Sequence, residues 1–211
     1  ERQMSALLKA GDDFITKPIS DSTLLTTVYA RAQRARMVSD ALARDSLTGL
    51  LKHADIKEQV ALEVERAQRS GKPTSVVMLD LDHFKQINDR WGHATGDEVL
   101  RIVANLMKAE LRDDDIIVFV GGEGLAAGLR NNNREAIEAV TGRLLQRIVE
   151  AGREVDGVPV HLSASIGGAS LALEHAAFSD VMASADRALY QAKHNGRNRA
   201  EFVTASAAAK P

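Results

Sequence analysis

The chain has 211 residues, and its 27 basic and 29 acidic side chains give a net charge of −2, which argues against a protein held on nucleic acid or an anionic membrane by bulk charge. Aromatic residues make up only 4%, too few for a base-stacking platform, and the lack of cysteine excludes disulfides and thiolate metal sites. No apolar run approaches the roughly 18 residues of a membrane-spanning helix. We therefore expect a cytoplasmic protein that binds no nucleic acid and has no membrane span.

Residues 1–20 are expected to be the end of a domain whose larger part lies upstream, since the chain begins with Glu1 and not with methionine. A brief apolar stretch at Phe14 and Ile15 predicts a strand. It stops at Lys17-Pro18, because proline disfavours helix in the residue before it.

Residues 21–44 are predicted to form one long helix. Small and apolar residues such as Leu24, Val28 and Ala32 recur at three- and four-residue steps and make a narrow seam. Arginines occupy the other faces. The pattern fits either a solvated linker helix or a stalk through which two copies dimerise.

Residues 45–203 are predicted to form one domain in which strands alternate with helices, an α/β or α+β sheet. A glycine turn between two apolar runs predicts a hairpin. The expected helices are 56–67, 96–111, 136–151 and 178–194, and the expected strands are 75–81, 116–120, 125–129 and 158–169. The small, polar tail 204–211 is expected to be disordered.

Three carboxylates stand where a cation could bind. Asp80 and Asp82 end an apolar strand, and the two-residue period puts them on one face. Glu123 lies in the hairpin turn, from which it could reach the end of that strand. Because Mg²⁺ takes one or two carboxylates together with phosphate oxygens, Asp80 and Glu123 indicate either a cation site or ordinary solvated charge.

Two further pairs have charges suited to phosphate. Lys193 and Arg197, four residues apart at the end of the last helix, either grip phosphates or only complement the helix dipole. Arg112 and Asp115, three residues apart before the hairpin, form either a clamp for a guanine edge and a phosphate or a solvated loop. The six histidines show no metal-ligand spacing.

Taken in order, these motifs resemble the GGDEF family of diguanylate cyclases over roughly residues 44–203. The likeness begins at Asp45-Ser46-Leu47-Thr48-Gly49-Leu50. It continues through Leu79-Asp80-Leu81-Asp82-His83-Phe84-Lys85-Gln86-Ile87-Asn88-Asp89, Gly92-His93 and Gly96-Asp97. It closes with Ala188-Leu189-Tyr190-Gln191-Ala192-Lys193 and Gly196-Arg197-Asn198. So many spaced matches make the likeness far more specific than any one motif.

The resemblance implies a palm-like fold similar to nucleotidyl cyclases, a central sheet flanked by helices with a β-hairpin that carries the signature turn. In the family, two domains face each other and each holds GTP and Mg²⁺. Each 3′-hydroxyl attacks the partner's α-phosphate, which yields cyclic di-GMP and pyrophosphate. The resemblance therefore implies Mg²⁺ wherever GTP is bound, and a homodimer in the full-length protein.

Site residues follow from the resemblance by position. Asp80, the Leu81 carbonyl and Glu123 correspond to the metal site, and Asp80 and Glu123 also to the catalytic carboxylates. The positions that correspond to GTP binding are Asn88 and Asp97 at guanine, Gly121 and Gly122 in the turn, and Lys193 and Arg197 at the phosphates.

The signature turn departs from the family pattern Gly-Gly-Asp/Glu-Glu-Phe. The chain has Gly121-Gly122-Glu123-Gly124-Leu125, so that Gly124 replaces the second carboxylate. Phe119 stands where the family usually has arginine. Because metals neutralise charge on the reacting phosphate, the loss of a carboxylate predicts a weak or inactive cyclase.

The product-binding motif of the family, R-x-x-D, is matched by Arg112 and Asp115, and Arg143 on the following helix corresponds to a second arginine of that site. The leading hypothesis is therefore a degenerate output domain that binds cyclic di-GMP there. The alternatives are an active diguanylate cyclase inhibited by its product at the same site, and a structural role in which the stalk helix and the domain serve only as a dimer or partner surface.

Residues 5–25 resemble the end of a response-regulator receiver domain, with Ala10-Gly11-Asp12-Asp13-Phe14-Ile15-Thr16-Lys17-Pro18 as its last strand and Lys-Pro turn. The resemblance implies an upstream sensor kinase as a partner. We thus expect a receiver end at 1–20, a stalk at 21–44, a GGDEF domain at 45–203 and a tail at 204–211.

Overall fold

The computed structural model describes residues 20–52, 65, 69, 74–130, 134–171 and 178–205. The receiver-like segment 1–19, almost all of the expected helix 56–67, the loop 131–133 and the tail residues 206–211 lie outside the described residues. The chain divides into two compact units, residues 1–42 and 43–211, and each is described by itself.

The helix predicted over 21–44 is present as α2 (Asp21–Ala43). Ser20 caps its start, since the Ser20 hydroxyl accepts a hydrogen bond of 3.2 Å from the Thr23 backbone N–H. Among the described residues of α2, Leu25, Val28 and Tyr29 are large apolar side chains that are more than half exposed. No described helix is long and apolar enough to cross a membrane.

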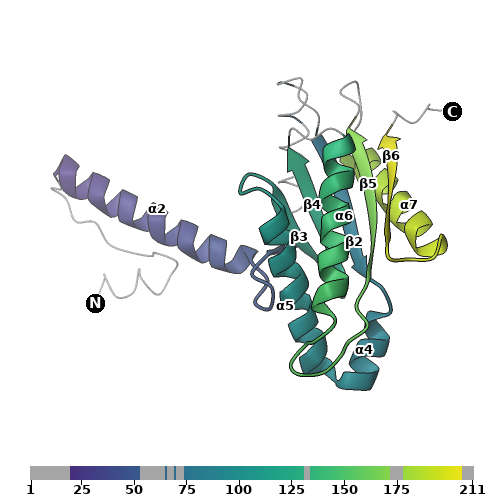
Figure 1. Cartoon of the computed structure of the whole chain (residues 1–211). Coiled ribbons are helices and arrows are strands. Elements are labelled where there is room, and N and C mark those ends of the chain that lie inside the picture. The colour runs from purple at the N-terminus through teal and green to yellow at the C-terminus, as the bar shows by residue number, and fades with distance from the viewer. Residues whose placement is uncertain are drawn as a thin grey trace. The chain divides into compact units, whose positions relative to one another are not determined.

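A six-stranded sheet forms the centre of the second unit (Figure 1). Its strands are β1 (Leu51–Lys52), β2 (Thr74–Leu81), β3 (Ile116–Gly121), β4 (Gly124–Arg130), β5 (Ala164–Leu171) and β6 (Arg199–Ala205). The spatial order is β1-β3-β4-β2-β5-β6. The two outer pairs, β1 with β3 and β5 with β6, are parallel, and the inner pairs are antiparallel. This mixed sheet confirms the predicted α/β fold class and the predicted hairpin.

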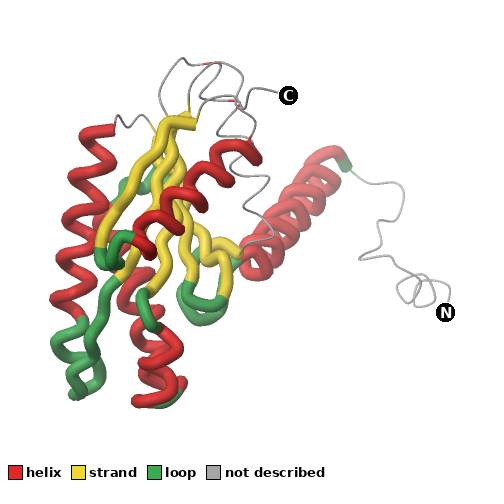
Figure 2. The backbone as a smooth tube through the Cα atoms, turned by 90° about the vertical axis from the view of Figure 1, so that its right-hand side faces the viewer, coloured by secondary structure: helices red, strands yellow, loops and turns green. Residues whose placement is uncertain are grey.

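Helices cover both faces of the sheet, as the side view in Figure 2 shows. The described helices of this unit are α4 (Phe84–Trp91), α5 (His93–Glu110), α6 (Arg134–Ala151) and α7 (Phe178–His194). Alternate residues of β2 divide between the faces: Val77 and Leu79 join the core under α5 and α6, and Val76 joins the core under α7. Asp80 lies in phase with Val76, so it belongs to the α7 face.

The backbone of α7 lies directly on β5. A Cβ at Gly167 would overlap the backbone of Ala185 and Leu189, so glycine is what allows this close approach. The helix ends at Gly196, a glycine with a positive φ of 109°. The Arg197 backbone N–H donates a hydrogen bond of 3.0 Å to the Ala192 carbonyl. The residues of the last turn of α7 are therefore held at a defined place above the sheet.

The structure corrects three expectations from the sequence. Residues 158–163 precede the strand rather than begin it, because Val158 pairs with Val155 across a tight turn and Val160 bonds back to Gly152. The short helix α4 and the strand β6 were not predicted. Because β6 runs to Ala205, the first two residues of the expected tail belong to the sheet.

Candidate functional site

The candidate site is a cavity of about 240 Å³ on the α7 face, at the end of β2 beside the hairpin turn. Its polar lining residues are Asp80 from β2, Glu123 from the turn, and Asp186 and Lys193 from α7. The Leu81 N–H donates to the Glu123 carbonyl at 3.4 Å, which ties the turn to the end of β2. The two predicted catalytic carboxylates, Asp80 and Glu123, therefore line one cavity.

Gly124 is directly opposite Asp80 in the β2–β4 register. Opposite residues of an antiparallel pair project to the same face, with Cβ atoms about 5 Å apart. A Cβ at Gly124 would lie 3.4 Å from the Gly121 carbonyl and 3.7 Å from the Val120 Cβ, which is ordinary contact. The fold therefore has room for a side chain beside Asp80 at this position.

The turn itself depends on the two glycines before Glu123. Gly121 has a φ of 112° and Gly122 a φ of 62°, backbone conformations that glycine adopts without strain. Gly124 is not among the residues with positive φ. The substitution at 124 thus changes the chemistry of the turn and not its backbone.

Lys193 and Asp80, predicted to bind phosphate and metal, form an ion pair with each other. The Lys193 Nζ lies 2.7 Å from the Asp80 Oδ1, with 37% of the lysine side chain and 21% of the aspartate side chain exposed. Arg197, the other predicted phosphate ligand, does not line this cavity. Its residue is exposed, in the left-handed turn after α7, with a φ of 62°.

Asp82 is not a lining residue of this cavity, although Ser165, whose hydroxyl donates to its carboxylate, stands opposite Asp80 in the β2–β5 register. It lies in the turn after β2 and is buried. Its carboxylate accepts hydrogen bonds of 2.7 Å from the hydroxyls of Ser163 and Ser165 and of 3.0 Å from the Asn198 backbone N–H. It therefore holds the end of β2 to β5 and to the start of β6, a structural role.

The predicted guanine-binding residues lie where α4 meets α5. Asn88 is half-buried, and its Oδ1 is buried without a hydrogen-bond partner among the described residues. A Cβ at Gly96 would overlap this oxygen and lie 2.9 Å from the Asn88 Cγ. Asp97 follows Gly96 in the first turns of α5 and is exposed. A buried amide oxygen without a partner is rare and costly, so this place is suited to a ligand that donates a hydrogen bond.

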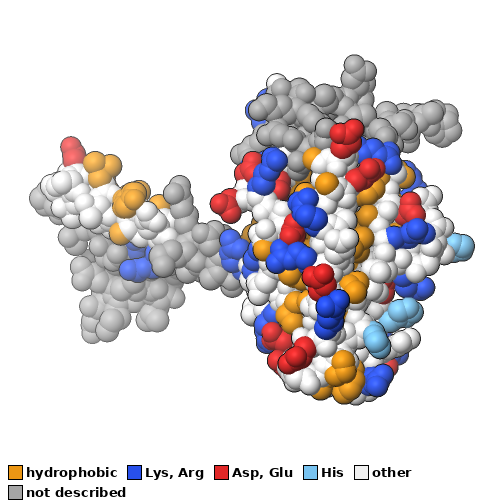
Figure 3. Space-filling view, in the orientation of Figure 1, with side chains coloured by type: hydrophobic (Ala, Val, Ile, Leu, Met, Phe, Trp, Pro, Cys, Tyr) orange, Lys and Arg blue, Asp and Glu red, His pale blue; other side chains and the backbone are white. Residues whose placement is uncertain are grey.

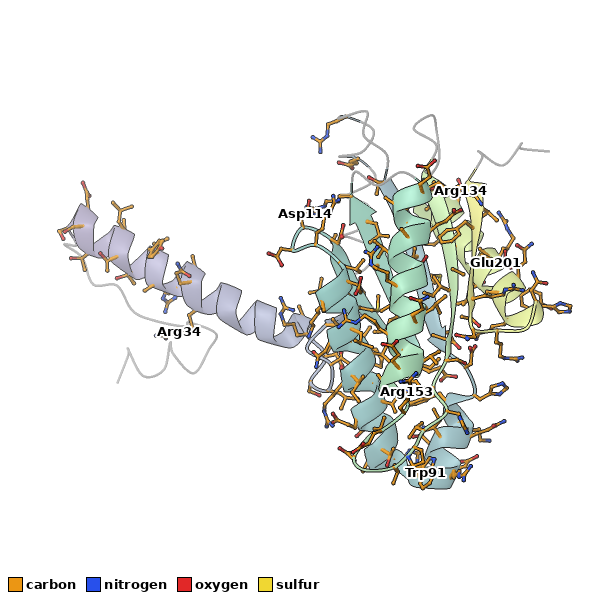
Figure 4. All side chains as sticks on the ribbon, in the orientation of Figure 1. Arg34, Trp91, Asp114, Arg134, Arg153 and Glu201 are labelled. Atoms are coloured by element: carbon orange, nitrogen blue, oxygen red, sulfur yellow. The ribbon has the colours of Figure 1, made fainter. Side chains whose placement is uncertain are left out.

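The predicted product-binding residues lie on the loop between α5 and β3. The Asp115 carboxylate accepts a hydrogen bond of 3.0 Å from the Arg112 backbone N–H and one of 2.9 Å from the Arg130 backbone N–H. These bonds close the loop against the end of β4. The Arg112 side chain is exposed. In Figure 4, Asp114 of this loop and Trp91 at the end of α4 lie near opposite ends of the domain. The loop is therefore separate from α4.

Arg143 of α6 is paired with Glu110, the last residue of α5. The Glu110 carboxylate accepts a hydrogen bond of 3.0 Å from the Arg143 Nε and one of 2.6 Å from an Arg147 guanidinium nitrogen. The hydrogen bond from Arg147 is the largest effect on the pKa of Glu110; burial opposes it, and the hydrogen bond from Arg143 adds to it, so that the pKa lies below its usual value. Arg143 thus clamps α6 to α5 two residues before Arg112.

Several motif residues turn out to be structural. The Asp45 carboxylate accepts hydrogen bonds from the Leu47 backbone N–H and from both the N–H and the hydroxyl of Thr48. The Lys108 ammonium donates a hydrogen bond of 2.8 Å to the Thr48 carbonyl. Leu125, at the signature phenylalanine position, is only 1% exposed in the core, and Phe119 packs against that core. These apolar residues are accommodated without opening the hairpin.

Asp186 is a lining residue that the sequence analysis did not single out. It is exposed and lies seven residues before Lys193, hence on the same face of α7. That spacing was the available signal. Basic and acidic side chains are otherwise interspersed over α5 and α6 (Figure 3), in keeping with the small net charge.

A sequence profile described as "Diguanylate cyclase, GGDEF domain" matches residues 42–199. The chain belongs to the GGDEF family. The GGDEF match covers strands β1 to β5, the candidate cavity and the Arg112–Asp115 motif, and it begins at the end of α2.

Relatives with known names agree with this assignment. The chain is 38% identical over 159 residues to the diguanylate cyclase DgcP of Pseudomonas aeruginosa, covering 75% of this chain and 24% of DgcP. It is 32% identical over 188 residues to the cyclic di-GMP phosphodiesterase NbdA of the same organism, covering 88% of this chain and 24% of NbdA. The chain thus spans about a quarter of the length of these relatives.

The fold also matches a solved structure of the coiled coil and GGDEF domain of DgcB from Caulobacter crescentus in complex with c-di-GMP. The TM-score is 0.75 at 25% sequence identity, and the match covers 86% of this chain and 98% of that one. A mixed sheet flanked by helices is therefore shared with a GGDEF protein that binds cyclic di-GMP.

Proposed function

We propose that this chain is the cyclic di-GMP signalling output of a response regulator that binds cyclic di-GMP through Arg112 and Asp115, with weak or no cyclase activity. The observation that carries the proposal is the altered cavity, where glycine stands opposite Asp80 in the register. The product motif, by contrast, keeps both its charged residues on one closed loop.

The weak activity follows from the chemistry of phosphoryl transfer. The transition state spreads negative charge over the phosphate oxygens, and cations held by carboxylates neutralise that charge. Loss of one such stabilising group costs on the order of 10²–10³ in rate in comparable enzymes. With Gly124, the cavity has lost a carboxylate next to the one that pairs with Lys193.

The remaining residues still fit Mg²⁺ when a phosphate is present. Asp80 and Glu123 line one cavity, and Mg²⁺ is commonly held by one or two carboxylates with substrate phosphates and water. In this proposal the Leu81 carbonyl supplies a further oxygen, and the bound ion would offset charge on the phosphates. The described residues contain no group of three or more His, Cys, Asp or Glu side chains suited to a metal, so we expect weak binding of the ion alone.

GTP would lie with its base at Asn88 and Asp97 and its phosphates toward the turn. The unpartnered Asn88 oxygen supports this orientation, since it accepts a hydrogen bond that guanine can donate. Gly121 and Gly122 leave the backbone of the turn open to the phosphates. Lys193 and Arg197 are the proposed cations for the phosphates.

Cyclic di-GMP would bind at the loop before β3. Arg112 offers an exposed guanidinium, which binds phosphate or a guanine edge through two parallel hydrogen bonds. Each Asp115 oxygen accepts one backbone hydrogen bond and keeps a second acceptor position. We include Arg143 in this site because it pairs with Glu110, the last residue of α5, which precedes Arg112 by two residues in the chain.

An active diguanylate cyclase with product feedback is the second candidate. Asp80, Glu123, Asn88 and Lys193 are all present, and relatives such as DgcP are named diguanylate cyclases. The match to NbdA shows that a similar segment also occurs in a protein named for the opposite reaction. Family membership alone therefore does not decide the activity of this chain.

The proposed context is a cytoplasmic response regulator. In this context, residues 1–20 end a receiver domain that a sensor kinase phosphorylates, and residues 21–44 form a stalk. The exposed Leu25, Val28 and Tyr29 of α2 support dimerisation through that stalk, because such side chains are stabilised when a second helix covers them.

The test is binding of cyclic di-GMP by equilibrium dialysis, after bound nucleotide has been removed. We expect Arg112→Ala to weaken binding at least tenfold, since a charge-assisted bidentate contact is lost. Arg153→Ala, which removes an exposed arginine from the other end of the domain, serves as the matched control and should bind like the native chain. Equal affinity of native chain and Arg112→Ala would refute the proposed site.

A further inference from the structure

The ion pair between Lys193 and Asp80 gives the cavity a counter-ion of its own. The ammonium and the carboxylate are 2.7 Å apart, at hydrogen-bond distance, in a cavity that also contains Glu123 and Asp186. The described lining of the cavity therefore carries three carboxylates and one ammonium. Such an excess of negative charge attracts cations, and Lys193 already supplies one at Asp80.

The place of Lys193 is set by the packing of α7. Ala185 and Leu189 lie with their backbone against Gly167 of β5, and the helix ends in the glycine turn at Gly196. The Cα of Lys193 is therefore held between two anchored points. Only its flexible side chain can swing away from Asp80, and that motion leaves the fold unchanged.

The residue opposite Asp80 decides how strongly a metal could compete. A second carboxylate at position 124 would add a ligand on the same face, whereas Gly124 adds none. A divalent ion would then have Asp80, Glu123 and the proposed Leu81 carbonyl oxygen as its protein ligands, and binding to Asp80 requires the ammonium to leave. The balance in this chain therefore favours Lys193.

We propose that Lys193 is the resident counter-ion of Asp80 and that a divalent cation enters this cavity only by displacing the Lys193 ammonium. Phosphate oxygens of a bound nucleotide offer the ammonium another partner, so nucleotide and cation bind with positive cooperativity. This inference concerns the cavity and is independent of cyclic di-GMP binding at Arg112.

The test measures the affinity of the full chain for Mn²⁺ in the absence of nucleotide. Electron paramagnetic resonance reports the concentration of the free ion. Lys193→Met should bind Mn²⁺ about two- to fivefold more tightly than the native chain, the range expected when one partly exposed ion pair is removed. Lys193→Arg, which keeps the charge, should remain near the native affinity. Arg153→Met controls for the change in net charge.

A double variant separates direct competition from a general effect. In the Asp80→Asn background, Lys193→Met should give no gain in Mn²⁺ affinity, because the carboxylate that the ammonium neutralises is gone. Equal Mn²⁺ binding by Lys193→Met and the native chain, including equally undetectable binding, would overturn the proposal. Cyclic di-GMP titration of the same variants reports folding and the Arg112 site, so failure of either proposal is seen separately.

Discussion

Two glycines of this domain, Gly96 in the first turn of α5 and Gly124 at the hairpin, differ in whether their surroundings would tolerate a side chain. At Gly96 a Cβ would overlap the Asn88 side chain, so glycine is required by space. At Gly124 a Cβ would meet its neighbours at 3.4 Å and 3.7 Å, which is ordinary contact. The region proposed to hold the base is therefore sterically demanding, whereas the region proposed to hold the phosphates has room for a side chain at position 124.

The difference teaches that the altered signature is a chemical change on an intact scaffold. Leu125 fills its core position, and Gly121 and Gly122 still form the turn that carries Glu123. A side chain introduced at position 124 would begin in ordinary contact with its neighbours. Three predictions test this comparison, from the largest expected effect to the smallest.

The largest effect is expected from Gly124→Glu. The new carboxylate would stand beside Asp80 and strengthen cation binding, so we expect the rate of cyclic di-GMP formation from GTP and Mg²⁺ to rise about 10²- to 10³-fold. Chromatographic quantification of product, with cyclic di-GMP removed beforehand, measures it. Gly124→Gln has nearly the same shape without the charge and should give little gain.

The native chain gives the reference point for that experiment. Substantial product from the native sequence would favour the active-cyclase alternative and would weaken the comparison drawn from Gly124. No gain in Gly124→Glu would mean that Phe119 or the dimer arrangement limits the reaction rather than the missing carboxylate.

A smaller but clear effect is expected from Gly96→Ala. The added methyl group would push the Asn88 amide out of place, so GTP affinity should fall tenfold or more, and overpacking should cost about 1–3 kcal/mol of folding free energy. The chain has one tryptophan, Trp91, one turn after Asn88, and its fluorescence during GTP titration measures the affinity. Gly142→Ala, a helical glycine with open space around it, is the control and should bind GTP normally.

The smallest effect is expected at the clamp between α5 and α6. The pKa of Glu110 is lowered in the folded chain, chiefly by Arg147, so this carboxylate stabilises the fold at neutral pH. That contribution is lost as the pH falls below about 4.3, where unfolded glutamate takes up a proton, and through the lower folded pKa. Glu110→Gln should cost about 1 kcal/mol at pH 7 by urea unfolding.

The same variant should behave differently in acid. At a pH below the folded pKa of Glu110, native chain and Glu110→Gln should have nearly equal stability, because both are then uncharged at this position. A constant difference between the two over the whole pH range would contradict the assigned ion pairs.

Much of the fold could be read from local sequence. The apolar run of β2, the paired glycines of the hairpin and the periodicity of α7 are signals within single segments, and all three elements lie close to their predicted bounds. Motif order gave the family, since several spaced motifs occur together over residues 42–199. The sequence did not predict the short, largely polar helix α4, because it has only two buried residues, Phe84 and Ile87. It did not predict the strand β6, because that strand depends on its pairing with β5.

The roles of the individual charges, by contrast, were decided by the tertiary structure. Asp80 and Asp82 are two residues apart and chemically alike, yet Asp80 pairs with Lys193 and Asp82 is buried and accepts hydrogen bonds from hydroxyls of β5 and its preceding loop. Lys193 lies more than a hundred residues after Asp80 in the chain, and the two meet only because α7 packs on the sheet at Gly167. Sequence carries residue type and local period, whereas the partner of a charge depends on distant segments that only the folded chain brings together.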